Sequence, residues 1–279
     1  MNLNQTTRIA GRTVMYVLLV VFAFIFAFPF YYVFVMASWE SSKFISIPPR
    51  LFFGDFWQEN ANTLFNKISF GRNIMTSIGI AVLATVTTLF FCTMGGFAFA
   101  RYKFVGKDTL FKIMLITFAI PATLNIVPFF KEIKFFGMYG TWLPFILPGM
   151  ANAFGIFLMS QFIKTSVPAE LLDAARIDGM NEFGILLRIG FPLARPGISV
   201  LGMLTFIGSW NDFLFAYIML PKLEDTTMPV AIMTLSSKSN VQMPPMMLGN
   251  VIALLPLSII LILFSKHIIS NLTAGSVKG

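Results

Sequence analysis

Six long stretches that are free, or nearly free, of charged side chains constrain this chain more than any other feature. They span residues 14–37, 74–100, 113–130, 143–163, 197–220 and 246–265. About 20 consecutive apolar residues suffice for a helix to cross the hydrocarbon core of a bilayer, and helices satisfy their own backbone hydrogen bonds there. We therefore predict an all-α polytopic membrane protein with six transmembrane helices.

The composition agrees with a membrane protein. Of the 279 residues, 57% are hydrophobic and 11% are charged, against about 25% charged in a typical soluble domain. The first apolar run is too long for the core of a signal peptide and no small-residue cleavage site follows it. We expect it to remain as a span, so that the mature chain begins near Met1 and residues 1–279 form a single transmembrane domain.

The third stretch, 113–130, contains two prolines that disturb a helix. Pro121 and Pro128 have no backbone N–H group, and their rings clash with the preceding turn. Freed backbone groups inside a membrane must be covered by neighbouring elements. We expect a kink or an unwound turn at this point of the third span.

Asp212 is the only carboxylate inside a predicted span. An ionisable group there is costly unless it faces protein or a watery cavity. Two interpretations stay open for Asp212: it lines or gates a transport pathway, or it makes a structural hydrogen bond within the bundle. Trp210 and Asn211 beside it, together with Asn125 and Asn152, are further pathway or gate candidates, although such amides are more often contacts between helices.

The basic side chains predict the orientation. Cytoplasmic loops carry an excess of Lys and Arg, and with the N-terminus inside, twelve of the 20 basic residues fall in cytoplasmic segments. These are Arg8, Arg12, Arg101, Lys103, Lys107, Lys112, Lys164, Arg176, Arg188, Arg195, Lys266 and Lys278. We predict a cell-membrane protein with both termini cytoplasmic. Topology and contacts with anionic membrane lipid account for the net charge of +8, and no nucleic acid is needed as a partner.

A polar segment, residues 164–196, separates the fourth and fifth spans. Ser166 and Pro168 suit the opening of a helix, Gly179 suits a left-handed cap, and Asn181 can cap a second helix. The segment therefore predicts a rigid cytoplasmic helix-turn-helix.

The first of these two helices carries charges at helical spacing. Glu170, Asp173 and Arg176 lie three to four residues apart, so they can share a face or bind a partner's groove. The small Ala174 and Ala175 permit close packing. An ordinary amphipathic surface hairpin with solvated charges would have the same pattern. A DNA-binding hairpin is excluded because the second helix, predicted at 183–191, is mostly apolar.

Several motifs resemble one known family. Residues 173–179, Asp-Ala-Ala-Arg-Ile-Asp-Gly, are similar to the EAA loop of ABC-importer permeases, with Asp in place of the usual leading Glu. The similarity continues in 189–197, Ile-Gly-Phe-Pro-Leu-Ala-Arg-Pro-Gly, and in 206–214, Phe-Ile-Gly-Ser-Trp-Asn-Asp-Phe-Leu. Residues 96–107 and the closing Leu-Thr-Ala-Gly-Ser-Val-Lys-Gly of 272–279 also fit. Together these segments resemble MalG-type permease subunits of carbohydrate importers.

The resemblance implies a role and partners. It implies a second, MalF-like permease subunit, two ABC ATPase subunits, an extracytoplasmic solute-binding protein and a carbohydrate substrate. ATP and Mg would bind to the ATPases, so this chain would hold no cofactor or metal and would not be an enzyme. The implied coupling residues are Glu170, Asp173, Ala174, Ala175, Arg176, Asp178 and Gly179. Those implied to contact the binding protein are Ser236, Ser237, Lys238, Ser239 and Asn240.

Three other functions compete with this one. A secondary transporter or channel that works without an ATPase would need more buried ionisable groups than Asp212. An intramembrane enzyme has little equipment here, because the chain holds a single Cys, Cys92, and a single His, His267. An ABC permease for an amino acid or peptide would also carry an EAA loop. Residues 210–213 and the closing segment favour the carbohydrate branch.

Overall fold

The computed structural model describes residues 3–44, 46–236 and 243–276, and all regular secondary structure in that part of the chain is helical. The predicted all-α class is confirmed for these residues. The chain divides into two compact units, Met1–Ile68 with Ile232–Leu254, and Ser69–Ala231 with Leu255–Gly279. Each unit is described by itself.

The first unit begins with a long apolar helix, α1 (Leu3–Ala37), and includes the short η1 (Ser41–Lys43) and α2 (Trp57–Lys67). Within α1, residues Gly11–Ala37 are long and apolar enough to cross a membrane. Side chains from Val14 to Phe30 are almost all exposed. Such an apolar surface requires lipid or other helices around it. This is what the prediction of a first span over residues 14–37 implies.

The loop after α1 is held by side chains that bond to the backbone. Asn60 on α2 donates to the carbonyls of Ala37 and Trp39, both at 2.9 Å. The Trp39 indole donates to the Phe52 carbonyl at 2.9 Å. The Arg50 guanidinium lies 4.1 Å from the centre of the Trp39 ring. These contacts order the long connection between the first and second predicted spans.

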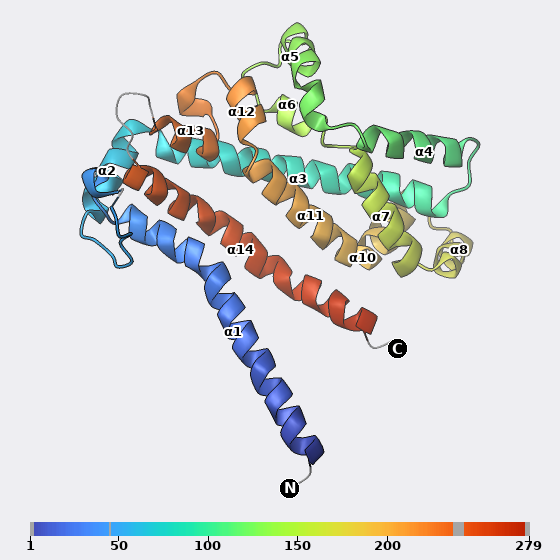
Figure 1. Ribbon diagram of the computed structural model, residues 1–279. Helices are drawn as coiled ribbons and strands as arrows, with labels where there is room; N and C mark the ends of the chain where they lie inside the picture. Colours follow the sequence, from blue (N-terminus) through green and yellow to red (C-terminus); the bar gives the residue numbers. More distant parts are fainter. Residues whose placement is uncertain (1–2, 45, 237–242, 277–279) are drawn as a thin grey trace. The chain divides into compact units, whose positions relative to one another are not determined.

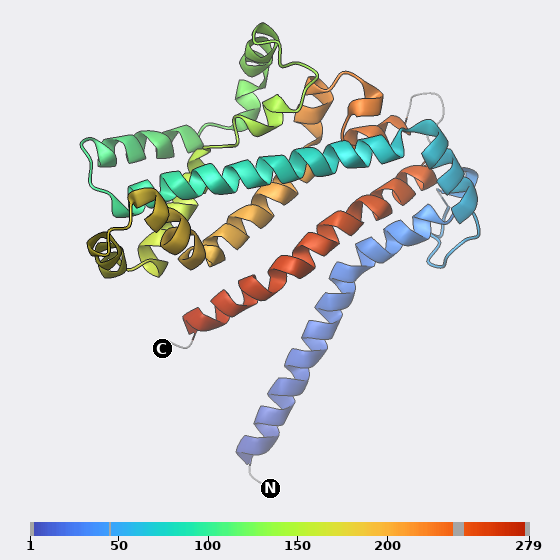
Figure 2. The same ribbon diagram turned by 180° about the vertical axis from the view of Figure 1, so that it is seen from behind.

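The core of the second unit is formed by three helices that pack along one another, α3 (Phe70–Arg101), α7 (Ala153–Ser166) and α11 (Arg195–Trp210) (Figures 1 and 2). Glycine lets the backbones approach closely. A Cβ on Gly96 would lie 2.6 Å from the Met159 Cβ, and one on Gly155 would lie 2.6 Å from the Cys92 Sγ. The absence of these two Cβ atoms makes the α3–α7 contact possible.

The remaining helices are short except for the last one. They are α4 (Lys107–Phe118), η2 (Ala122–Asn125), α5 (Ile126–Phe135), α6 (Leu143–Ile146), α12 (Phe213–Met219), η4 (Leu223–Asp225), α13 (Met228–Thr234) and α14 (Met243–Ser276). The helices α8, α9, η3 and α10 are described with the site. Along the sequence, α14 passes from the first unit into the second at Leu255.

Three helices in the described residues are long and apolar enough to be single spans: Gly11–Ala37, Phe70–Arg101 and Met243–Ile262. Two pairs of helices, each bent by more than 40° at a short break, raise this number to five at most. The pairs are Lys107–Phe118 with Thr123–Phe135, and Glu182–Leu193 with Arg195–Trp210. The predicted count of six therefore remains a prediction. The break in the third span lies where Pro121 predicts it, between α4 and η2, whereas Pro128 lies in the first turn of α5, where its missing N–H costs no hydrogen bond.

The fourth and fifth predicted spans are interrupted too. The apolar composition of these two stretches does not reveal the interruptions. A turn separates α6 from α7, and Asn152 caps α7 by accepting from the Gly155 amide at 2.7 Å. Asn211 and Asp212 separate α11 from α12, and Asp212 caps α12 by accepting from the Phe215 amide at 3.2 Å. Each stretch is thus two helices joined by non-helical backbone.

Candidate functional site

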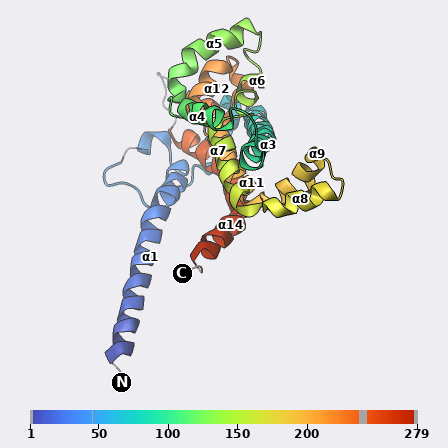
Figure 3. The ribbon, with the colours of Figure 1, turned by 90° about the vertical axis from the view of Figure 1, so that its right-hand side faces the viewer.

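The polar segment between α7 and α11 folds into a hairpin that we call the elbow, residues 167–194. Its first helix is α8 (Ala169–Ile177), and its second begins with α9 (Glu182–Ile185). Figure 3 shows α8 and α9 extending sideways from the end of α7. The predicted helix-turn-helix is therefore present.

The turn of the elbow has the predicted caps. Gly179 has φ +80, the left-handed conformation that favours glycine, and its amide donates to the Arg176 carbonyl at 3.0 Å. Asn181 accepts from the Gly184 amide at 2.7 Å and so caps α9. Both of these features depend on residues within the turn itself.

Two details of the elbow differ from the sequence prediction. Ser166 does not open a helix: it is the last residue of α7, and its hydroxyl donates to the Phe162 carbonyl at 2.6 Å. The second helix is not a single α-helix over 183–191, because after α9 it widens into a π-helical turn, η3 (Leu186–Gly190), followed by α10 (Phe191–Leu193). A Cβ on Gly190 would lie 3.0 Å from the Phe97 ring, so glycine lets this turn lie against α3.

One face of the elbow belongs to the core of the second unit. Leu172, Ala175, Ile185 and Leu186 are buried in the same apolar cluster as residues of α3, α7 and α11. Close-packed interiors transmit displacement because they have few voids to absorb it. The elbow and the three core helices are therefore mechanically connected.

The other face of the elbow is exposed, and it mixes acidic with apolar side chains. Glu170, Asp173, Ala174 and Asp178 are exposed. Three apolar side chains are exposed beside them, Leu171 at 43%, Ile177 at 86% and Phe183 at 56%. Of the two predicted packing alanines, Ala175 is buried and Ala174 faces outward. An exposed cluster of large apolar side chains with charges around it is typical of a surface that binds a partner.

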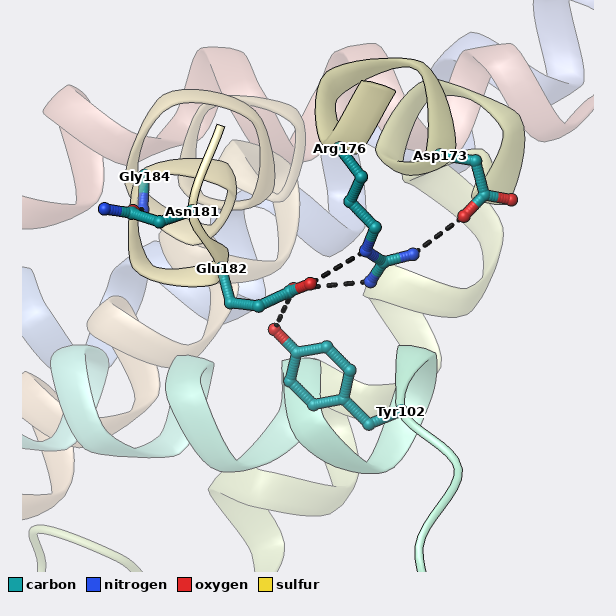
Figure 4. A network of polar contacts seen from close by, with 6 residues as sticks. All are labelled: Tyr102, Asp173, Arg176, Asn181, Glu182 and Gly184. Atoms are coloured by element: carbon teal, nitrogen blue, oxygen red, sulfur yellow. Dashed lines mark hydrogen bonds and ion pairs between the residues drawn. The ribbon is translucent and has the colours of Figure 1, made fainter. Parts of the chain in front are cut away.

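Glu182 is the centre of an ionic network, drawn in Figure 4. Arg176 donates through Nε to Glu182 Oε1 at 2.8 Å and through a terminal nitrogen to Oε2 at 3.3 Å. Arg176 also donates to Asp173 at 2.7 Å, and the Tyr102 hydroxyl donates to Glu182 Oε2 at 2.7 Å. We call these four residues the Glu182 network. It ties α8 and α9 to each other and to the end of α3.

The network determines the charge of its members. Hydrogen bonds from Arg176 and then from Tyr102 lower the pKa of Glu182. The bond to Glu182 is the main cause that raises the pKa of Arg176. Burial, and then the bond to Glu182, raises the pKa of Tyr102 to about 12. At neutral pH the network therefore holds a carboxylate, a guanidinium and a neutral phenol.

Replacing Glu182 with glutamine is expected to loosen the elbow. The substitution removes the charge that Arg176 and Tyr102 bind, and because the network is largely exposed, the loss should be at most about 1 kcal/mol. Hydrogen exchange of amides in α8 and α9 at neutral pH should accelerate by about fivefold or less. Asp178→Asn is the matched control, since it removes an exposed elbow carboxylate that lies outside the network, and exchange should stay unchanged.

The contribution of Glu182 to the stability of the elbow should depend on pH. Because the folded pKa of Glu182 is lowered, its stabilisation is complete above the ordinary glutamate pKa of about 4.3 and is lost as pH falls through the lowered value. The difference in elbow exchange between wild type and Glu182→Gln, compared at matched pH, should be constant from pH 7 to 6 and vanish in strong acid. A difference that disappears between pH 7 and 6 would contradict this assignment.

Sequence reasoning did not single out three residues that connect the elbow region. Arg101 donates to the carbonyls of Ile163 and Lys164, both at 2.9 Å, and so binds the C-terminal end of α7. Tyr102 and Glu182 form the network. The available signal was an Arg-Tyr pair directly after the second span and an acid directly after the cap Asn181. Neither pattern reveals a bond between residues 80 positions apart.

The pathway candidates fall into two groups. Asn125 and Asp212 line one cavity of about 400 Å³. Asn152 is engaged in capping α7, and Trp210 is buried, with its ring stacked 6.0 Å from that of Phe206. Asn211 is exposed in the break between α11 and α12. The structure thus brings two of the five candidates together at one cavity.

The proposed contact segment for a binding protein is described only at its start. Ser236 follows α13, and its amide donates to the Met233 carbonyl at 3.0 Å. Ser237, Lys238, Ser239 and Asn240 lie outside the described residues. The chain leading to this segment is anchored on α3, where Asn73 donates to the Leu223 and Thr226 carbonyls at 2.9 and 3.0 Å.

Comparisons with known proteins give one consistent family. Residues 92–273 match the model of a family described as "binding-protein-dependent transport system inner membrane component". The arabinooligosaccharide transport system permease protein AraQ of Bacillus subtilis is 35% identical over 222 residues, 79% of each chain. The trehalose transport system permease protein SugB of Mycobacterium tuberculosis is 30% identical, covering 79% of this chain and 82% of the relative.

A solved structure has the same fold. It is a bacterial ABC transporter involved in the import of the acidic polysaccharide alginate, of which one chain aligns with a TM-score of 0.78 and 23% identity. The alignment covers 94% of this chain and 97% of that one. At this identity the likeness concerns the arrangement of helices.

Proposed function

This chain belongs to the family of binding-protein-dependent transport system inner membrane components, and from that premise we propose that it is a permease subunit of an ATP-driven importer that moves a carbohydrate across the cell membrane. The observation that carries the proposal is the family match over residues 92–273, which includes the whole elbow. The saccharides named for the relatives, arabinooligosaccharides and trehalose, support the substrate class.

The elbow is the proposed point of coupling to the ATPases. Its exposed face, with Ile177, Phe183 and the acids Glu170 and Asp173, would bind a groove between or within the ATPase subunits. Its buried face packs into the core formed with α3, α7 and α11. When ATP closes the ATPases, the elbow would move as a rigid body and bias the bundle toward an outward-facing state.

The remaining parts of the proposal concern topology and partners. Six spans, the third, fourth and fifth of them interrupted, would place both termini and the elbow in the cytoplasm. A second, MalF-like permease would complete the pathway, and the segment 236–240 would contact an extracytoplasmic binding protein. The chain would do no bond chemistry itself, because ATP and Mg would bind to the partner subunits.

Affinity purification of this chain from its native membrane in nanodiscs, followed by mass spectrometry of the bound proteins, tests the proposal. We expect an ABC ATPase, a second permease and a solute-binding protein to copurify, and vesicles containing them to take up a saccharide only with ATP. Isolation of the chain alone in a transport-active preparation would instead establish a secondary transporter. Uptake of an amino acid or peptide would move it to another branch of the family.

A further inference from the structure

Two helix interruptions in the second unit meet at one cavity. The cavity has a volume of about 400 Å³, and its lining includes Thr123 and Asn125 from η2 and Asp212 from the break before α12. Non-helical backbone at membrane depth is tolerated where it is buried in protein or lines a water-filled space. The volume lies in the range of about 300–1,000 Å³ that is usual for small-molecule sites.

The polar groups at this cavity have free hydrogen-bonding capacity. Asp212 Oδ1 accepts from the Phe215 amide at 3.2 Å, which leaves Oδ2 without a hydrogen bond to any residue that the structure describes. The side chains of Asn125 and Thr123 likewise make none within that part of the chain. A carboxylate oxygen, an amide and a hydroxyl are therefore available to a ligand with several hydroxyl groups.

An apolar wall completes the cavity. Phe129 on α5 and Phe215 on α12 also line it, and their rings stack with centroids 5.8 Å apart at 28°. The Phe145 ring packs edge-on against Phe215 at 4.9 Å, which fixes the position of that ring. A few polar groups set against rigid aromatic surface are suited to a ring that has one apolar face and a rim of hydroxyls.

The charge of the cavity selects among such ligands. Among the described residues that line the cavity, Asp212 is the single charged side chain and none is basic. A neutral sugar can donate hydroxyl hydrogens to the carboxylate in a charge-assisted bond. A uronate or a sugar phosphate would instead bring a second negative charge to an uncompensated one, which is unfavourable.

We propose that this cavity is a subsite for one sugar unit of a neutral saccharide, with Asp212 and Asn125 binding hydroxyls and Phe129 and Phe215 supporting the ring face. The inference rests on the proposed function, since it names the substrate class within it. It also separates this chain from its structural neighbour, which serves an acidic polysaccharide.

Protection of an engineered cysteine tests the subsite in the complete importer reconstituted in nanodiscs. Asn125→Cys is labelled with a methanethiosulfonate reagent in the presence of arabinotriose, trehalose or alginate trisaccharide, and labelling of this chain is measured by mass spectrometry. The native Cys92 is buried and gives a low background. Leu124→Cys is the matched control, because Leu124 is adjacent and 69% exposed but does not line the cavity.

We expect at least one neutral sugar to slow labelling of Asn125→Cys by about fivefold or more, and neither sugar class to slow labelling of Leu124→Cys. Alginate trisaccharide should give no protection, and adding Asp212→Asn should weaken protection by the neutral sugar. Equal protection by alginate trisaccharide would overturn the preference for neutral ligands. Uptake assays with the same variants show whether a variant that loses protection by sugar also loses transport.

The outcomes also separate this inference from the proposed function. If the importer takes up arabinotriose or trehalose while neither protects Asn125→Cys, the subsite is wrong and the importer function stands. If the importer takes up an amino acid or peptide but none of the three saccharides, and none protects, the carbohydrate function on which the subsite depends is contradicted.

Discussion

Replacing Gly179 with proline is expected to abolish ATP-driven uptake while the chain still inserts in the membrane. Gly179 has φ +80, whereas the proline ring holds φ near −65°. Proline would also remove the amide that donates to the Arg176 carbonyl at 3.0 Å. The turn between α8 and α9 therefore cannot keep its geometry, and the Glu182 network that spans it is lost with it.

The measurement is sugar uptake by membrane vesicles, with the amount of inserted chain determined on the same vesicles. Uptake should fall below about a tenth of the wild-type value. Gly137→Pro is a closely matched control, because Gly137 has φ +69, its amide donates to the Lys134 carbonyl at 3.1 Å, and it ends α5 rather than an elbow helix. We expect that control to retain substantial uptake. Normal uptake by Gly179→Pro would remove the case for the elbow as the coupling element.

Replacing Gly96 with alanine is expected to destabilise the helical core of the second unit. The added Cβ would lie 2.6 Å from the Met159 Cβ and 2.8 Å from the Ser160 backbone nitrogen. Backbone cannot rotate away as a side chain can, so α3 and α7 must separate. Overpacking of this kind costs about 1–3 kcal/mol.

The adjacent Gly95 provides the control for this prediction. Its added Cβ would lie 3.2 Å from Ile156 Cγ1, an atom of a side chain that can adjust. Alanine also favours helix over glycine by about 1 kcal/mol, so Gly95→Ala should be close to neutral. Unfolding of the purified chain by sodium dodecyl sulfate in mixed micelles measures both variants. Equal midpoints would show that α3 and α7 do not pack at Gly96 as described.

Features that depend on neighbouring residues were predictable from the sequence. Gly179 and Asn181 determine the elbow turn through their own backbone conformation and capping bonds. Pro121 breaks the third span because its ring and missing amide act within one turn of helix. The apolar stretches indicate membrane helices because the preference for lipid over water is a property of each side chain by itself.

Hydropathy did not predict the breaks in the fourth and fifth spans, because it is the same on both sides of them. The stretch 143–163 contains α6 and α7, and 197–220 contains α11 and α12, yet by hydropathy alone both stretches are continuous spans. Ser166 shows the same limit. A serine can cap a following helix or bond back to the preceding turn, and only the path of the chain decides which occurs.

By itself, the sequence determined the membrane class, the all-helical fold, the family and the elbow turn, because each depends on composition or on contacts within a few residues. Only the tertiary structure decided which distant groups meet. It brings Tyr102 to Glu182 across 80 positions and places Asn125 at the same cavity as Asp212. Such pairs depend on how α3 packs with α9 and how η2 packs with α12. Packing is set by the shapes of many side chains together rather than by any one segment.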